Sequence, residues 1–232
     1  MKIGIVTLFP EIIHPAVFSS ILGRAQRSQI VEFKIINPRD FAYDRHHKVD
    51  DSPYGGEPGM LIKPEPVALA IESFPLTSST KIIFVEPHGI RFDQSHAEFL
   101  AQCEELLIVC GHYEGLDARL EEYFEPMVFS VGDFILTGGE IPALLIADSI
   151  VRRLPSALGN EESLNSDSFS EQNRGLLSAP NYTRPEVWRG ISVPTEITNG
   201  NHKEITRFRE KMALDRTALI RPDLLNDSIE KP

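Results

Sequence analysis

The sequence predicts an α/β fold, a parallel sheet covered by helices on both faces, followed by a small helical C-terminal domain. Two observations lead to this prediction. Over the first 155 residues, short segments rich in Val, Ile and Phe alternate with segments of helical periodicity, which is the pattern of a parallel sheet with crossover helices. A polar segment then ends the alternation, and an amphipathic helix follows it.

The five expected strands are short, apolar and rich in β-branched residues, as strands buried on both faces are. They are KIGIVTLF (2–9), VEFKIIN (31–37), KIIFVEP (81–87), ELLIVCG (105–111) and MVFSVGDFIL (127–136). Among the expected helices, Asp93 is suited to an N-cap and Pro142 to a first helical turn. These helices span residues 16–29, 64–74, 93–103, 116–123 and 141–154.

The segment 160–175, NEESLNSDSFSEQNRG, is polar and nearly free of large apolar side chains, which predicts a flexible linker. It separates an expected domain of residues 1–159 from a small helical domain of residues 176–232. In the small domain, Asn201 and Glu204 form a capping-box pattern at the start of a helix. We expect this helix to bury Ile205, Phe208 and Met212 and to present a basic face of Lys203, Arg207 and Lys211.

The net charge of −11 argues against a protein that coats nucleic acid without specificity. The charge is uneven, because residues 91–150 contain Arg91 and Arg119 as their only Lys or Arg, whereas residues 181–221 contain eight Lys or Arg against five acids. The basic end is either a footprint for a polyanion or a solvated helix face. Cys103 and Cys110 fit no metal spacing. Without a secretory leader or an apolar run of ~20 residues, a cytoplasmic, reduced protein is expected.

Glycines gather after three of the expected strands, in EPHG, CGHYEG and VGDFILTGGE. They match neither the G-x-G-x-x-G fingerprint nor the P-loop pattern. In an open α/β sheet, loops at the carboxyl ends of neighbouring strands build one ligand crevice. The glycines either open that crevice to a ligand or serve their separate turns. They are Gly89, Gly111, Gly115, Gly132, Gly138 and Gly139.

Two ionisable residues outside these loops are candidates for chemistry. Asp167, in the polar segment, is either a solvated acid or a general base that acts when a partner orders the segment. Arg152 is either a surface arginine or a group that faces a developing oxyanion. The loop YDRHHKVDDSPYGGEPGM is suited to nucleotide contact or is a surface Ω-like loop, and its adjacent His46 and His47 are poor partners in one metal site.

Taken together, the motifs resemble the bacterial tRNA (guanine-N1)-methyltransferase family of the SPOUT class, which modifies the guanosine immediately 3′ of the anticodon, position 37. The resemblance runs in order from residue 1 to about Leu225. It is carried by PYGGEPGM, EPHG, CGHYEGLDAR, SVGDFILTGGEIPALLIADSIVR, LPSALGN, DSF, GLLSAPNYTRPEVWRGISVP and ITNGNHKEITRFR.

The resemblance implies a deep trefoil knot in the α/β domain, a homodimer with the active site at its interface, a tRNA substrate and S-adenosylmethionine as methyl donor. Asp167 is implied as the general base and Arg152 as the catalytic arginine. Mg²⁺ is implied as a further cofactor, without assigned metal ligands. The implied donor site comprises Pro87, Gly89, Gly111, Tyr113, Gly115, Val131, Gly132, Asp133, Phe134, Ile135, Leu136, Gly138, Gly139 and Pro142.

The sequence departs from the family pattern at Glu86, where serine is usual, and at Glu57-Pro58 in a loop that is usually richer in glycine. Two alternative functions fit the sequence less well. A SPOUT enzyme that methylates another RNA site, such as a ribose, has no obvious use for the acid in DSF. A non-catalytic RNA-binding protein has no need for both Asp167 and Arg152.

Overall fold

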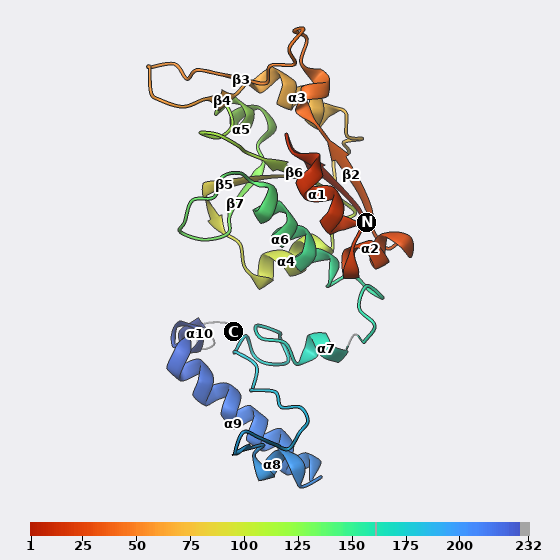
Figure 1. The fold of residues 1–232 in the computed structure, drawn as a ribbon, viewed down its shortest axis with the longest axis vertical. Helices are drawn as coiled ribbons and strands as arrows, with labels where there is room; N and C mark the ends of the chain where they lie inside the picture. Colours follow the sequence, from red (N-terminus) through yellow and green to blue (C-terminus); the bar gives the residue numbers. More distant parts are fainter. Residues whose placement is uncertain (161, 228–232) are drawn as a thin grey trace. The chain divides into compact units, whose positions relative to one another are not determined.

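The computed structural model describes residues 1–160 and 162–227 (Figure 1). It divides into two compact units, Met1–Gly159 and a second unit that begins at Asn160. A search of the described helices finds none with the length and apolar character to cross a membrane.

The first unit is built on a five-stranded sheet in the order β2-β1-β6-β5-β7, in which every neighbouring pair is parallel. This confirms the parallel sheet predicted from the apolar segments. The strands are β1 Lys2–Val6, β2 Glu32–Ile36, β5 Lys81–Arg91, β6 Glu105–Cys110 and β7 Met127–Ser130.

Helices cover both faces of this sheet. Alternate strand residues point to opposite faces, so Ile83 and Ile108 belong to one apolar cluster whereas Phe84 and Leu107 belong to the other. The first cluster is covered by α1 Pro10–Val17, α2 Ser20–Arg27, α4 Gln94–Ala101 and α6 Glu140–Val151. The second is covered by α3 Pro64–Glu72 and α5 Arg119–Phe124, and the 3-10 helix η1 Pro38–Phe41 packs on α3.

Two observed strands, β5 and the edge strand β7, differ in extent from the expected ones. Strand β5 continues past Pro87, because residues 86–89 form a bulge after which Ile90 pairs with Phe129, the same residue that pairs with Val85. Strand β7 ends at Ser130 rather than at Leu136, since Gly132 adopts a φ of +151° and the chain leaves the sheet there. Both differences shape the loops at the carboxyl ends of the strands.

The expected helix 16–29 is two helices. Ser20 has a left-handed φ of 49°, which a continuous helix cannot accommodate, so α1 ends before Phe18 and α2 starts at Ser20. The expected N-cap at Asp93 is confirmed, because its carboxylate accepts the backbone N–H of His96 at 3.1 Å. Pro142 lies in the first turn of α6, as expected.

A two-stranded antiparallel hairpin, β3 Asp50–Asp51 and β4 Leu61–Ile62, extends from the first unit. Most side chains between residues 43 and 60 are exposed, including Tyr54. The hairpin is tied to the loop after β6, because the Glu114 N–H donates to Met60 O at 3.0 Å and the Ile62 N–H donates to Gly115 O at 3.1 Å.

The second unit contains α7 Glu162–Asn165, β8 Val187–Trp188, β9 Ile191–Ser192, α8 Thr195–Thr198, α9 His202–Ile220 and α10 Asp223–Asp227. Asn201 caps α9 as expected, by accepting the Lys203 N–H at 3.2 Å. The expected reciprocal contact of Glu204 is wrong. The Asn199 side-chain amide intervenes, since it donates to Glu204 at 2.7 Å while its oxygen accepts the Asn201 N–H at 2.8 Å.

Helix α9 has the two faces that its sequence predicts. Ile205, Phe208 and Met212 are half-buried, and Ala213 and Thr217 are fully buried one turn on. The Thr217 hydroxyl accepts the Leu177 N–H at 3.0 Å and so ties the preceding segment to the helix. The basic residues Lys203, Arg207 and Lys211 are all exposed.

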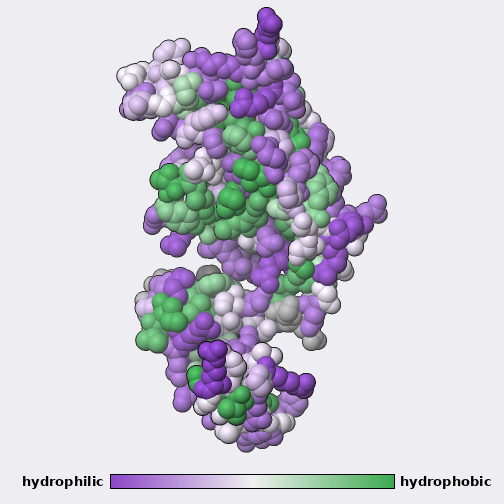
Figure 2. All heavy atoms as spheres, viewed as in Figure 1, coloured by the Kyte–Doolittle hydropathy of each residue, from purple (hydrophilic) through white to green (hydrophobic). Residues whose placement is uncertain are grey.

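One apolar surface of the first unit is exposed. Figure 2 shows hydrophobic side chains gathered over the loop that follows β7 and over α6. These side chains are Phe134, Ile135 and Leu136 of the loop and Ile141 and Leu145 of α6, with exposed fractions between 43% and 79%. Exposed apolar patches of this kind mark interaction surfaces.

Candidate active site

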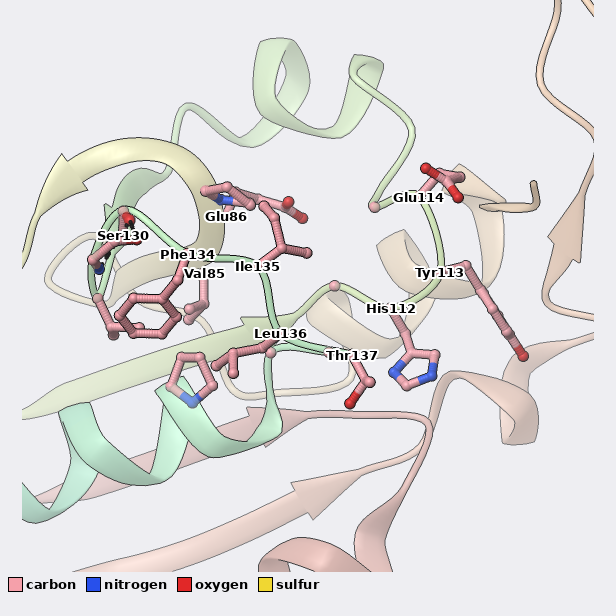
Figure 3. A pocket seen from close by; sticks show the side chains of 18 residues that line it. Val85, Glu86, His112, Tyr113, Glu114, Ser130, Phe134, Ile135, Leu136 and Thr137 are labelled. Carbon is pink, nitrogen blue, oxygen red and sulfur yellow. Dashed lines mark hydrogen bonds between the residues drawn. The ribbon is translucent and has the colours of Figure 1, made fainter. Parts of the chain in front are cut away.

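The three glycine-bearing segments meet in one cavity of about 200 Å³, at the bulge of β5 and the carboxyl ends of β6 and β7 (Figure 3). The shared crevice expected from the sequence is therefore present in the fold. The lining residues are Val85, Glu86, Pro87, Gly111, His112, Tyr113, Glu114, Gly115, Ser130, Val131, Gly132, Phe134, Ile135, Leu136, Thr137, Gly138, Gly139 and Pro142.

The loop 131–139 encloses the cavity by returning from the sheet edge toward its centre. Strand β5 lies between β6 and β7 in the sheet. The chain nevertheless pairs with the residues after β6 when it leaves β7, since the Gly139 N–H donates to Gly111 O at 2.7 Å and His112 forms a bridge with Gly138. Residues on three strand ends are brought together by this crossing.

The loop approaches the end of β6 so closely that glycine is needed at both Gly138 and Gly139. A Cβ at Gly139 would lie 2.9 Å from the Cα of Cys110, in the backbone of β6. A Cβ at Gly138 would collide with His112 Nδ1 and Glu140 Oε2, which are themselves buried. Side chains at these positions would push the loop away from the strand end and open the cavity.

Glu86 places a carboxylate in the cavity from the bulge of β5. Its Oε1 atom is buried and has no hydrogen-bond partner among the residues that the structure describes. Burial raises the pKa of Glu86 to about 7, and the nearby Glu121 adds to this increase, while His88 and the Leu116 N–H oppose it. The carboxylate therefore changes charge near neutral pH.

A second buried polar group lies beneath the loop. Glu140, only 3% exposed, accepts the hydroxyl of Thr7 at 2.8 Å, and His112 Nδ1 lies 3.8 Å from its other oxygen. Burial raises the pKa of the neighbouring Cys110 thiol, and the carboxylates of Glu140 and Glu86 raise it further. Cys110 is therefore a protonated core residue rather than a reactive thiol.

Of the donor-site residues that the resemblance implies, all but Gly89 and Asp133 line the cavity. Gly89 has a different reason to be glycine, because a Cβ there would lie 2.6 Å from the backbone of Phe129 in β7. Asp133 is exposed, on the loop but outside the lining. Six further residues line the cavity, and all of them except Val85 are sequence neighbours of an expected donor-site residue. They are Val85, Glu86, His112, Glu114, Ser130 and Thr137.

The two expected catalytic residues lie outside the cavity lining. Asp167 belongs to the second unit, in a turn where the buried Ser170 donates its hydroxyl to Asn165 O at 2.9 Å. Its own side chain is partly exposed. Arg152 is the C-cap of α6 and is also partly exposed. Gly139, which lines the cavity, is the N-cap at the opposite end of the same helix.

The comparisons with known proteins agree along the whole chain. The sequence model of a family described as tRNA (Guanine-1)-methyltransferase TrmD matches residues 1–227. A tRNA (guanine-N(1)-)-methyltransferase of Bacillus subtilis is 49% identical over 98% of this chain and 93% of its own length. Proteins of the same name from Halalkalibacterium halodurans and Dehalococcoides mccartyi are each 47% identical over 97% of this chain, and over 91% and 90% of their own lengths.

Proposed function

Since the chain belongs to the tRNA (guanine-1)-methyltransferase family, we propose that it transfers a methyl group from S-adenosylmethionine to guanine N1 at position 37 of tRNA, immediately 3′ of the anticodon. The match over residues 1–227 carries this proposal, because it includes all three cavity loops and the segment with Asp167. Its tRNA substrate also favours a cytoplasmic location.

The cavity has features suited to the donor. Its walls are formed by glycines and by the main chain of residues 131–139, which offers N–H and C=O groups to an adenine. Within the described part of the chain its lining contains the carboxylates of Glu86 and Glu114 and no Lys or Arg, which suits a cationic ligand. S-adenosylmethionine, when bound, supplies an activated methyl group on a sulfonium sulfur.

Asp167 is proposed as the general base. Guanine N1 carries a proton at neutral pH and is a poor nucleophile until that proton leaves, so a carboxylate within hydrogen-bond reach of N1 accelerates the reaction. Negative charge then develops toward the guanine O6. Arg152 is proposed to stabilise that charge, because a guanidinium is always protonated and donates hydrogen bonds in a fixed geometry.

The position of Arg152 favours an active site shared between two copies of the chain. Helix α6 separates Arg152 from Gly139 at the cavity by roughly 20 Å, at about 1.5 Å per residue. This is further than an arginine side chain extends, so Arg152 does not reach the cavity of its own subunit. We propose a homodimer in which the arginine of one subunit serves the cavity of the other.

The exposed apolar surface supports this dimer. Phe134, Ile135 and Leu136 lie beside the cavity, and Ile141 and Leu145 follow on α6, the helix that also carries Arg152. A twofold contact through this surface would bury the same apolar side chains from both subunits. It would also bring α6 of each subunit toward the cavity of the other.

Two surfaces are proposed to contact tRNA. One is the exposed basic face of α9, formed by Lys203, Arg207 and Lys211, which is suited to phosphates. The other is the exposed loop 43–60. It contacts the cavity rim, because Gly59 packs closely against the Glu114 side chain and Met60 O accepts the Glu114 N–H at 3.0 Å. Splaying of the guanine from the anticodon loop would let it enter the site.

The trefoil knot and Mg²⁺ remain proposals from family membership. The path of residues 131–139 supports the knot, because the chain leaves β7, crosses the neighbouring strand β5 and contacts Gly111 after β6 before α6 packs on one face of the sheet.

For Mg²⁺, the described residues contain no cluster of three His, Cys, Asp or Glu side chains that could hold a metal ion. No step is therefore assigned to Mg²⁺.

The proposed function is tested with labelled S-adenosylmethionine and two tRNA transcripts that differ only in carrying guanosine or adenosine 3′ of the anticodon. Label should enter the guanosine transcript alone, and digestion should recover it as N1-methylguanosine. Equal labelling of both transcripts, or label on a ribose, would exclude the proposed reaction. The second result would favour the alternative SPOUT enzyme acting on another RNA site.

A further inference from the structure

The backbone geometry of the bulge in β5 places Glu86 in the cavity. Because Val85 and Ile90 both pair with Phe129, the four residues between them are expelled from the ladder, and Glu86 is the first of these. Its carboxylate extends from the end of β5 toward the loop after β6 (Figure 3). A Cβ at Gly111 would collide with Glu86 Oε1, and one at Gly115 would lie 3.5 Å from Oε2.

Burial raises the pKa of Glu86 and outweighs the imidazole of His88 and the backbone N–H of Leu116, which both lower it. The titratable groups that shift the pKa of Glu86 are His88 and Glu121, which are paired with each other at 3.0 Å. The Glu86 carboxylate in turn raises the pKa of the Cys110 thiol. Among the described residues, Oε1 has no hydrogen-bond partner. A buried carboxylate oxygen without a hydrogen-bond partner is costly, and a bound ligand that supplied positive charge would reduce that cost.

The methyl donor and its demethylated product differ in the positive charge that they could bring to Glu86. The donor carries a positive sulfonium, and the sulfur becomes a neutral thioether when the methyl group leaves. A carboxylate beside the sulfur would stabilise the donor and not the product, and burial of the Glu86 Oε1 atom strengthens this electrostatic difference. A carboxylate that contacted the ribose hydroxyls would stabilise both equally.

We propose that Glu86 is a donor-binding residue that selects the sulfonium form over the demethylated product. This inference rests on the proposed function, because it takes S-adenosylmethionine as the ligand. It assigns to Glu86 a role that depends on charge. The same residue then favours product release, since the carboxylate loses its counter-charge on methyl transfer and takes up a proton from solvent at neutral pH.

The test is the affinity of the protein for S-adenosylmethionine and for S-adenosylhomocysteine, measured by calorimetry without tRNA at pH 8. Glu86→Gln keeps the shape of the side chain and removes its charge, so donor affinity should fall about tenfold while product affinity changes less than about twofold. Glu86→Asp should recover part of the donor affinity. Glu122→Gln, which removes an exposed acid of α5 outside the cavity lining, is the matched control and should leave the donor-to-product ratio within about twofold of wild type.

Proton linkage gives a second readout. Donor affinity of the wild-type protein should rise between pH 6 and pH 8, as Glu86 ionises, and binding at pH 7 should release a proton to the buffer. Glu86→Gln should abolish both effects. Equal losses for donor and product in Glu86→Gln would overturn the inference alone, whereas failure of the wild-type protein to bind the donor would contradict the proposed function and the inference together.

Discussion

Asp167 is the residue on which the proposed proton transfer depends. Asp167→Asn keeps the size and much of the hydrogen bonding of the side chain but cannot accept the N1 proton. We expect kcat to fall by about 10²–10⁴-fold, with donor affinity unchanged because Asp167 lies outside the cavity lining. Single-turnover methylation and calorimetry measure the two quantities. Glu171→Gln, an exposed acid in the same segment, is the control. A kcat near wild type for Asp167→Asn would exclude it as the base.

The raised pKa of Glu86 makes a separate prediction about stability. The folded protein holds the Glu86 proton up to a pKa of about 7, against a usual value of 4.5, so the folded state is destabilised as pH rises through this interval. Glu86→Gln has no carboxyl group to ionise, so it removes this pH-dependent loss of stability. The variant should exceed wild type by about 3 kcal/mol in free energy of unfolding at pH 8 and match it near pH 4.

Thermal unfolding of wild type and Glu86→Gln across this pH range checks the sign and the size. At pH 8 the variant should melt roughly 6–12 °C higher, given the usual dependence of Tm on stability for a chain of this size. A difference that stayed constant from pH 4 to pH 8 would mean that ionisation of Glu86 is not its origin.

At the scale of elements, Gly89 tests the bulge that presents Glu86. A Cβ at Gly89 would lie 2.6 Å from the Phe129 backbone, so Gly89→Ala must displace β7 or β5. We expect a loss of about 2–4 kcal/mol in free energy of unfolding, measured by urea denaturation. Gly159→Ala is the matched control, because no described atom would lie within 4 Å of the added Cβ. Comparable losses in both variants would show that the close packing of Gly89 is not responsible.

The strands were predictable from sequence because burial on both faces leaves a local apolar signature. The ends of strands and helices were less predictable from sequence. The end of β7 depends on Gly132 leaving the sheet, and the break before α2 depends on the left-handed Ser20, neither of which has a periodic signal. The spacing of glycines was enough to predict a shared cavity. The burial of Glu86 was not predictable, because it depends on the bulge of β5 and on the close approach of Gly111 and Gly115 in the loop after β6.

At the scale of the whole molecule, the active site is expected to need two subunits. The length of α6 keeps Arg152 from the cavity of its own chain, and the exposed apolar surface lies between them. Sedimentation or light scattering should therefore give twice the mass of the 26.0 kDa chain. Leu145→Glu, on the exposed side of α6, should yield monomers, since it would place two like charges in a twofold apolar contact.

Mixing two inactive chains tests whether Arg152 acts across the interface. Arg152→Ala lacks the proposed oxyanion group but keeps its cavity, whereas Thr137→Trp fills the cavity at an exposed lining residue and keeps Arg152. Each homodimer should be inactive. If Arg152 serves the partner's cavity, one of the two sites in every mixed dimer is complete, so co-expressed chains should recover about a quarter of wild-type activity. If Arg152 serves its own cavity, no mixed dimer contains a complete site, and activity should stay at the level of the single variants.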